Sequence, residues 1–341
     1  MPSTVPTTSE FNDLVLQVNI IKDGIAKLDE RLKKLEGSTT PTPEPTPIPT
    51  PEPPTPTPTP PPTGNGNDRF GIKKIYSDAP SPVEWAVNMD NPASTSNFKN
   101  LPTITKQSDG SFQTSATQVR MEAWSPINKK WLNVEITAYQ KFITGTPAYG
   151  YIFQLYRGGG HHSENTITQQ CWGAAYKTAM LNKDTCSTQC RKEVNHPAYC
   201  QDRAQTKTST KPLQNRWIGM KQVTYNYLKD GKTYVRIEVW VDDDVTDAQG
   251  NLVIKNDWKL FSNTRDEGGW GVSATNTDFV ANCPKMNKDS NQQYRQRDEI
   301  LNMPGVGNDT NNLQNLCAWR SDNCTNNWKF LSVREITPPT T

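Results

Sequence analysis

The stretch RWIGMKQVTYNYLKDGKTYVRIEVWVD, residues 216–242, decides the fold class. From Val235 to Val241, apolar side chains occupy every second position and charged residues lie between them, which is the period of a half-buried β-strand. Trp217–Leu228 forms a second apolar run, and Lys229-Asp230-Gly231-Lys232 separates the two. A tight turn between strands needs a residue that tolerates positive φ, and Gly231 supplies it. The stretch therefore predicts an antiparallel hairpin.

Similar runs recur along the chain with turn residues between them, and no long helical period appears after residue 40. Such spacing predicts an all-β antiparallel sandwich or jelly roll over residues 68–341. The further predicted strands are Gln118–Trp124, Leu132–Phe142, Gly150–Tyr156, Trp258–Phe261 and Lys329–Ile336.

Residues 1–37 carry a different pattern, in which apolar residues recur with the 3-4 spacing of a left-handed coiled coil. Ile21 at a d position disfavours a dimer, so a parallel trimer is expected; the alternative is one amphipathic helix docked on the main domain. The a positions are Phe11, Val18, Ile25 and Leu32, and the d positions are Leu14, Ile21, Leu28 and Leu35.

Residues 38–67 form a proline-rich linker, in which 13 of the 22 residues from Pro41 to Pro62 are proline. Such a tract should adopt extended polyproline II and, if straight, span about 70 Å. A ligand for proline-recognition modules is the alternative to a spacer. A spacer behind an oligomeric helix would display several copies of the main domain together, which gives avidity for a repetitive target.

The net charge of +2 argues against a nucleic-acid partner, because phosphate neutralisation needs an excess of basic residues. No apolar run approaches the roughly 20 residues that cross a bilayer. The N-terminus lacks the basic start and apolar stretch of a secretory signal. The β-rich main domain nevertheless looks extracellular, so we expect a location outside the cell or on a virion or cell surface.

The pattern of residues 216–242, with a late closing strand Phe330–Ile336, resembles the concanavalin A-like lectin/glucanase superfamily. The resemblance implies a jelly roll over about residues 70–337. Its members include lectins, laminin G-like modules, glucanases and alginate-type polysaccharide lyases, and the fold does not choose among them.

The resemblance also implies a sugar groove on the concave sheet. Three stretches would line it: Val119–Glu122, Gln154–Arg157 leading to a glycine loop, and Ala318–Arg320. Arg120 and Glu122 share a strand face, which suits either uronate recognition or a buried ion pair. The expected carbohydrate-binding residues are Arg120, Glu122, His161, His162, His196, Tyr199 and Arg320. The histidine loops have an alternative interpretation as exposed loops without a role.

If the protein is a lyase, Arg120 or Arg320 would neutralise the uronate carboxylate, and His162 or Tyr199 would supply the base and acid of β-elimination. The lyases carry a tyrosine-lysine pattern in their late strand, where this chain has Trp319-Arg320. A glucanase would need two facing carboxylates; the Glu-x-Asp-x-x-Glu pattern of the retaining glucanases is absent, and Glu238 and Asp242 are a candidate pair on one strand.

Seven cysteines favour disulfides that pin long loops, with Cys317 and Cys324 as one possible pair. Cys186, Cys190, His196 and Cys200 could instead form a zinc site. Asp242, Asp244 and Asp247 crowd one turn, where calcium could relieve their repulsion, although a solvated loop is the simpler interpretation. No other cofactor is expected.

Together these features favour an oligomeric, lectin-like module that attaches to a glycan surface. A polysaccharide lyase is the first alternative and a purely structural spike or fibre element is the second.

Overall fold

The computed structural model describes residues 66–99, 101–126, 130–146, 151–158, 175–181, 187–195, 198–200, 211–267 and 316–340, with 151–158, 181, 187, 193–195 and 198–200 described by strand pairing alone. The predicted coiled coil and most of the linker lie outside these residues. Within them, no helix is long and apolar enough to span a membrane.

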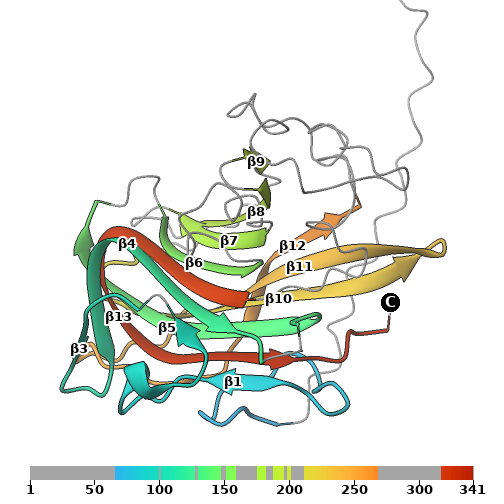
Figure 1. Cartoon of the computed structure of the whole chain (residues 1–341). Coiled ribbons are helices and arrows are strands. Elements are labelled where there is room, and N and C mark those ends of the chain that lie inside the picture. Colours follow the sequence, from blue (N-terminus) through green and yellow to red (C-terminus); the bar gives the residue numbers. More distant parts are fainter. Residues whose placement is uncertain are drawn as a thin grey trace, which may run out of the picture. The chain divides into compact units, whose positions relative to one another are not determined.

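The described part is all-β and antiparallel, as predicted (Figure 1). One short 3-10 helix, η1, covers Pro92–Ser94. The strands are β1 (Glu84–Ala86), β2 (Phe98–Lys99), β3 (Ile104–Lys106), β4 (Phe112–Trp124), β5 (Val134–Gly145), β6 (Tyr151–Gly158), β7 (Ala175–Leu181), β8 (Ser187–Asn195), β9 (Ala198–Cys200), β10 (Trp217–Lys229), β11 (Lys232–Asp242), β12 (Lys259–Asp266) and β13 (Leu316–Glu335).

The hairpin predicted from residues 216–242 is confirmed as β10 and β11, with Lys229 opposite Lys232. Asp230 and Gly231 have φ of 52° and 72°. Positive φ at both central residues is the geometry of a type I′ turn, whose twist matches that of the strands.

No strand is predicted from the sequence between Tyr156 and Trp217, and the structure corrects this. The structure places β7, β8 and β9 there, paired in order beside β6. These strands are short and do not alternate apolar with polar residues regularly, so they do not stand out from the sequence.

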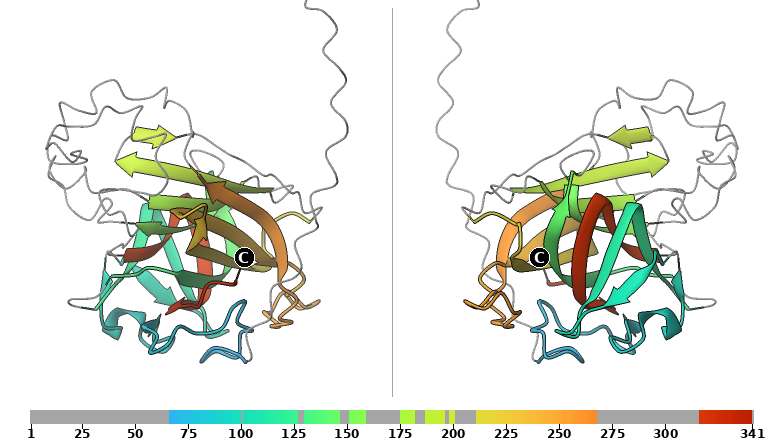
Figure 2. Two further views of the ribbon diagram at one scale, coloured as in Figure 1. Left: turned by 90° about the vertical axis from the view of Figure 1, so that its right-hand side faces the viewer. Right: turned by 90° about the vertical axis from the view of Figure 1, so that its left-hand side faces the viewer.

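The strands form two layers that β13 joins (Figure 2). Its first part, Leu316–Arg320, pairs with β4 and β6, and its last part, Ser332–Glu335, pairs with β5. We call β4, β6–β9 and the first part of β13 the front layer. The back layer is β1, β5, β10–β12 and the last part of β13.

Two irregular positions let β13 change neighbours. Asn323 and Phe330 have φ of 51° and 59°, which is unusual for residues other than glycine. Register shifts lie nearby, between Thr325 and Asn326 and between Lys329 and Ser332. Bulges of this kind bend a strand and increase its twist, so β13 can pass from one layer to the other.

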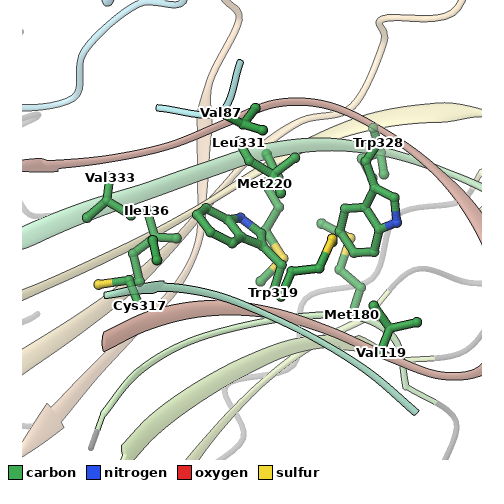
Figure 3. Packing of buried hydrophobic residues seen from close by; sticks show 14 of the residues in the cluster. Val87, Val119, Ile136, Met180, Met220, Cys317, Trp319, Trp328, Leu331 and Val333 are labelled. Carbon is green, nitrogen blue, oxygen red and sulfur yellow. The ribbon is translucent and has the colours of Figure 1, made fainter. Parts of the chain in front are cut away.

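The apolar core lies between the layers (Figure 3). The fully buried Trp319 of the front layer packs among back-layer side chains that include Ile136 and Met220. Its indole Nε1 also donates a hydrogen bond to the carbonyl of Thr137 in β5 (3.2 Å). A buried N–H thus finds a partner across the core, which fixes the two layers against each other.

The outer face of the back layer is covered by residues 68–78 and 245–258. Ile72, Val245 and Trp217 belong to one buried cluster that joins both segments to the sheet. Ile75 and Tyr76 belong to another, on β10. This face is therefore closed, and the outer face of the front layer is the remaining broad surface on which a site could form.

Candidate functional site

The front layer brings together the three stretches that the resemblance assigned to a groove. Arg120 of β4 lies opposite Arg320 of β13, and Arg320 lies opposite Gln154 of β6. One step along, Ala318 lies between Glu122 and Tyr156 in the same way. Since Val119 and Met121 belong to the core, the alternation of β4 turns Arg120 and Glu122 to the outer face. We call this outer face of the front layer the polar face.

Strands β7 and β8 extend the polar face with residues that the sequence did not single out. The register continues the first row through Ala179 to Gln189 and the second through Lys177 to Arg191. Neighbouring Tyr176 and Thr178 bond to back-layer side chains, so Lys177 between them points outward. The only sequence signal was the dipeptide Tyr176-Lys177, a tyrosine-lysine pair in a middle strand rather than the late one.

Asp322, which no pattern in the sequence singles out, pairs with both arginines. Arg120 Nη1 is paired with Asp322 Oδ1, and Arg320 bonds Asp322 Oδ2 through Nε (3.0 Å) and Nη2 (2.7 Å). Burial alone would raise the pKa of the Asp322 carboxyl, but the charges of Arg320 and Arg120 outweigh it and hold that pKa below its usual value. Arg120 is thus part of a buried ion cluster, although its partner is Asp322 rather than Glu122.

Glu122 lies two residues beyond Arg120 on β4. It is fully buried, and Trp124 Nε1 donates to its Oε2 (3.0 Å). The ammonium of Lys99 lies 4.3 Å from the centre of the Trp124 ring, a cation–π contact. Trp124 itself packs against Leu316, Ala318 and Ala175, all on the polar face. An indole at the margin of a small-residue floor is a surface on which a sugar ring can stack.

The charges and sizes of these side chains define what the polar face can bind. Exposure is 0% for Glu122, 1% for Lys177 and 7% for Arg120, so these three side chains are buried. From β4 to β8 the polar face crosses four strand spacings, about 19 Å, which is long enough for several sugar rings. The described charged side chains on it are Arg120, Lys177, Arg191 and Arg320 against Glu122 and Asp322. A net positive, amide-bearing site over small residues suits a ligand that carries carboxylates or other anionic groups.

The structure does not describe the side chains of the other predicted site residues. His161, His162 and His196 lie outside the described residues. Tyr199 is in strand β9 opposite Glu193, not in the loop that the sequence suggested. Their assignment to carbohydrate binding stays a prediction.

The acidic turn does not gather into a calcium site. Asp242 is buried and accepts bonds from Tyr139 Oη (2.9 Å) and the Asn256 N–H (3.1 Å). Asp244 pairs with two lysines, and Asp247 accepts backbone N–H bonds within its own turn. Among the residues described, no group of three or more candidate ligands could hold a metal ion.

Glu238 and Asp242, the pair considered for a hydrolase, lie on the covered face of the back layer. Glu238 accepts hydrogen bonds from Tyr76 Oη, Tyr225 Oη and Trp240 Nε1. Burial raises the pKa of its carboxyl. Both carboxylates therefore lie beneath the covering segments and not on the polar face.

The proposed disulfide between Cys317 and Cys324 is wrong. Both residues lie on β13, and seven strand steps separate them by about 23 Å, far beyond the reach of a disulfide. No disulfide joins the three cysteines whose side chains the structure describes, Cys190, Cys317 and Cys324, and all three are buried. The remaining members of the zinc hypothesis, Cys186, His196 and Cys200, have no described side chain.

Comparison with known proteins finds similarity only among solved structures. No family model and no curated protein matches the sequence. The alginate lyase Aly36B is 10% identical, with a TM-score of 0.36 over 77% of this chain and 99% of that one. The exoplasmic/lumenal domain of VIP36, in its Ca2+/Man-bound form, is 10% identical, with a TM-score of 0.39 over 76% of this chain and 91% of that one.

Proposed function

We propose that this protein binds an acidic glycan on the polar face of its front layer and that it does so multivalently. The observation that carries the proposal is that four cationic side chains share one sheet face with several alanines: Arg120 and Arg320 on one row, and Lys177 and Arg191 on the next. Guanidinium and ammonium groups recognise carboxylates, and the low local dielectric strengthens each contact. The heptads of residues 1–37 and the linker of residues 38–67 support the display of several such sites together.

β-Elimination is the second candidate, and Lys177 favours it. A buried lysine can act as a general base when it is neutral, and the neighbouring arginines could neutralise a uronate carboxylate. The first experiment separates the candidates. The full-length protein is passed over immobilised polyuronate, sulfated glycan and neutral glucan, and the ultraviolet absorbance of an unsaturated uronate is followed in parallel.

Retention on the acidic glycans without a rise in absorbance would support the binding module. A rise in absorbance would support the lyase. If the protein shows neither retention nor a rise in absorbance, both proposals are overturned, and a structural spike or fibre element is the best account.

Replacing Lys177 with methionine should reduce affinity for the retained acidic glycan by about 10- to 100-fold, because one cation of the site is lost. Methionine keeps the length of the stem, and the thermal midpoints of both proteins are measured alongside to separate affinity from stability. Isothermal titration on both proteins measures the change. Lys259→Met removes a lysine that is 63% exposed on β12 and serves as the control, with unchanged affinity expected. Equal affinity of the Lys177 variant and the wild type would remove the polar face from consideration.

Replacing Ile21 and Leu28 with aspartate should give monomers that bind soluble oligosaccharide as the wild type does but lose avidity for a surface. Charged groups at d positions of a coiled coil are incompatible with its buried seam. Light scattering reports the assembly, and retention on a densely coated surface reports avidity, which should fall at least about 100-fold. Oligomers that survive both substitutions would contradict the coiled-coil hypothesis.

A further inference from the structure

The interior of the sandwich is polar, not apolar, behind β7 and β8, the strands that carry Lys177 and Arg191. Around Trp319 and Trp328 the core is apolar, but between β7, β8 and β12 it holds charged groups. Lys192 Nζ of β8 lies 2.8 Å from Asp266 Oδ2 of β12, and neither side chain is exposed. Tyr176 of β7 donates its hydroxyl to the same oxygen (2.5 Å). Three strands from both layers thus converge on one buried carboxylate.

A second polar bridge joins the same layers. Thr178 of β7 donates to Gln222 Oε1 of β10 (2.9 Å). Gln222 in turn donates its amide to the Tyr176 carbonyl (3.2 Å) and to Thr224 Oγ1 (3.0 Å). All four of these residues are buried. Both the backbone and the side chains of β7 are therefore hydrogen-bonded to the back layer.

These inward groups alternate with the outward cations on the same strands. Lys177 lies between Tyr176 and Thr178, and Arg191 directly precedes Lys192. Because successive side chains of a strand point to opposite faces, whatever fixes the inward residues also fixes the outward ones. A shift of β7 or β8 relative to the back layer would move both cations.

Stability alone does not account for a buried ion pair. Replacing such a pair by well-packed apolar residues is often neutral or stabilising, because desolvation offsets the attraction between the charges. An ion pair is more specific in geometry than an apolar contact, because its partners must lie at hydrogen-bond distance and in a defined orientation.

We propose that Tyr176, Lys192 and Asp266 act as a positioning clamp that holds Lys177 and Arg191 in register for ligand. The inference rests on the proposed function and names residues that act on the ligand only through the strands they fix. The three residues do not touch the polar face themselves.

The test removes the charges without removing the volume. The variant Lys192→Met/Asp266→Leu in the full-length chain should stay folded, with a thermal midpoint equal to or above that of the wild type. Its affinity for the polyuronate that the wild type retains should fall at least about tenfold, and backbone amides of residues 175–181 and 187–195 should exchange faster. Tyr176→Phe, which removes only one hydroxyl, should give a smaller loss in the same direction.

Arg216→Met/Asp243→Leu is the matched control, because it removes a partly buried pair far from β7 and β8 in the sheet order (2.5 Å between Arg216 Nη1 and Asp243 Oδ1). It should leave affinity unchanged. Wild-type affinity in the folded clamp variant would overturn the clamp and leave the proposed function standing. If the wild type retains no acidic glycan, the proposed function fails, and the clamp is then judged by exchange alone: unchanged exchange in both strands would overturn it. Should the double variant fail to fold, Tyr176→Phe carries the test through the same two measurements.

Discussion

Asp322→Ala is expected to destabilise the main domain by about 3–5 kcal/mol, because it leaves the cations of Arg120 and Arg320 buried beside each other without their carboxylate. Denaturation in urea, followed by tryptophan fluorescence, measures the loss. Asp244→Ala provides the control. Its carboxylate is 65% exposed, so removing it should produce no measurable change although it contacts two lysines. A wild-type midpoint for Asp322→Ala would show that the cluster does not hold the front layer together.

The effect of Asp322 should depend on pH in a defined direction. Its folded-state pKa is below the ordinary 3.8, because Arg320 and Arg120 outweigh the effect of burial. A carboxyl whose pKa is lowered by folding contributes its full stability above the unfolded value and loses it as the pH falls through the folded one. The difference between wild type and variant should therefore be constant above pH 3.8 and shrink below it. A difference that instead grows with acidity would contradict the ion-cluster account.

Glu135→Gln is expected to cost a similar amount, about 3–5 kcal/mol at neutral pH, and to loosen the covering segment of residues 68–78. Glu135 accepts bonds from Lys221 Nζ (2.5 Å), Arg334 Nη2 (2.6 Å) and the Ile75 N–H (3.0 Å). Lys221 is fully buried and Arg334 nearly so, so the neutral amide would leave Lys221 without its counter-charge and Arg334 with Asp78 alone. Urea denaturation gives the loss, and hydrogen exchange of the segment reports its loosening.

The stability loss of Glu135→Gln should shrink as the pH rises, whereas that of Asp322→Ala shrinks as the pH falls. Burial lowers the pKa of Lys221 even beside Glu135, and the amide removes the attraction that opposes this shift. The unfolded chain then binds more protons than the folded one, so the stability of Glu135→Gln should rise as the pH increases from neutral toward 10.5. Glu84→Gln is the control. Glu84 lies opposite Arg334 in register but is exposed, so no change is expected there. If both variants behaved alike, the buried network would not be what anchors the segment.

The sequence by itself determined the class of the main domain and the register of its central hairpin. Val235–Val241 alternates so regularly that only one face can be buried, and Asp230-Gly231 accepts the positive φ that a two-residue turn requires. Local spacing also sufficed to bring Arg120 and Glu122 onto one strand face, because the period of a strand is fixed by its geometry.

Only the tertiary structure decided which distant residues meet. Asp322 pairs with Arg120, 202 positions away in the sequence. Lys192 of β8 pairs with Asp266 of β12, and no local sequence pattern indicates that these strands lie together. The structure also separated Cys317 from Cys324 along one strand and enclosed Glu238 and Asp242 beneath the covering segments. The physical reason is that pleat and turn act over a few residues, whereas strand order and layer packing are set by how the whole apolar surface is buried at once.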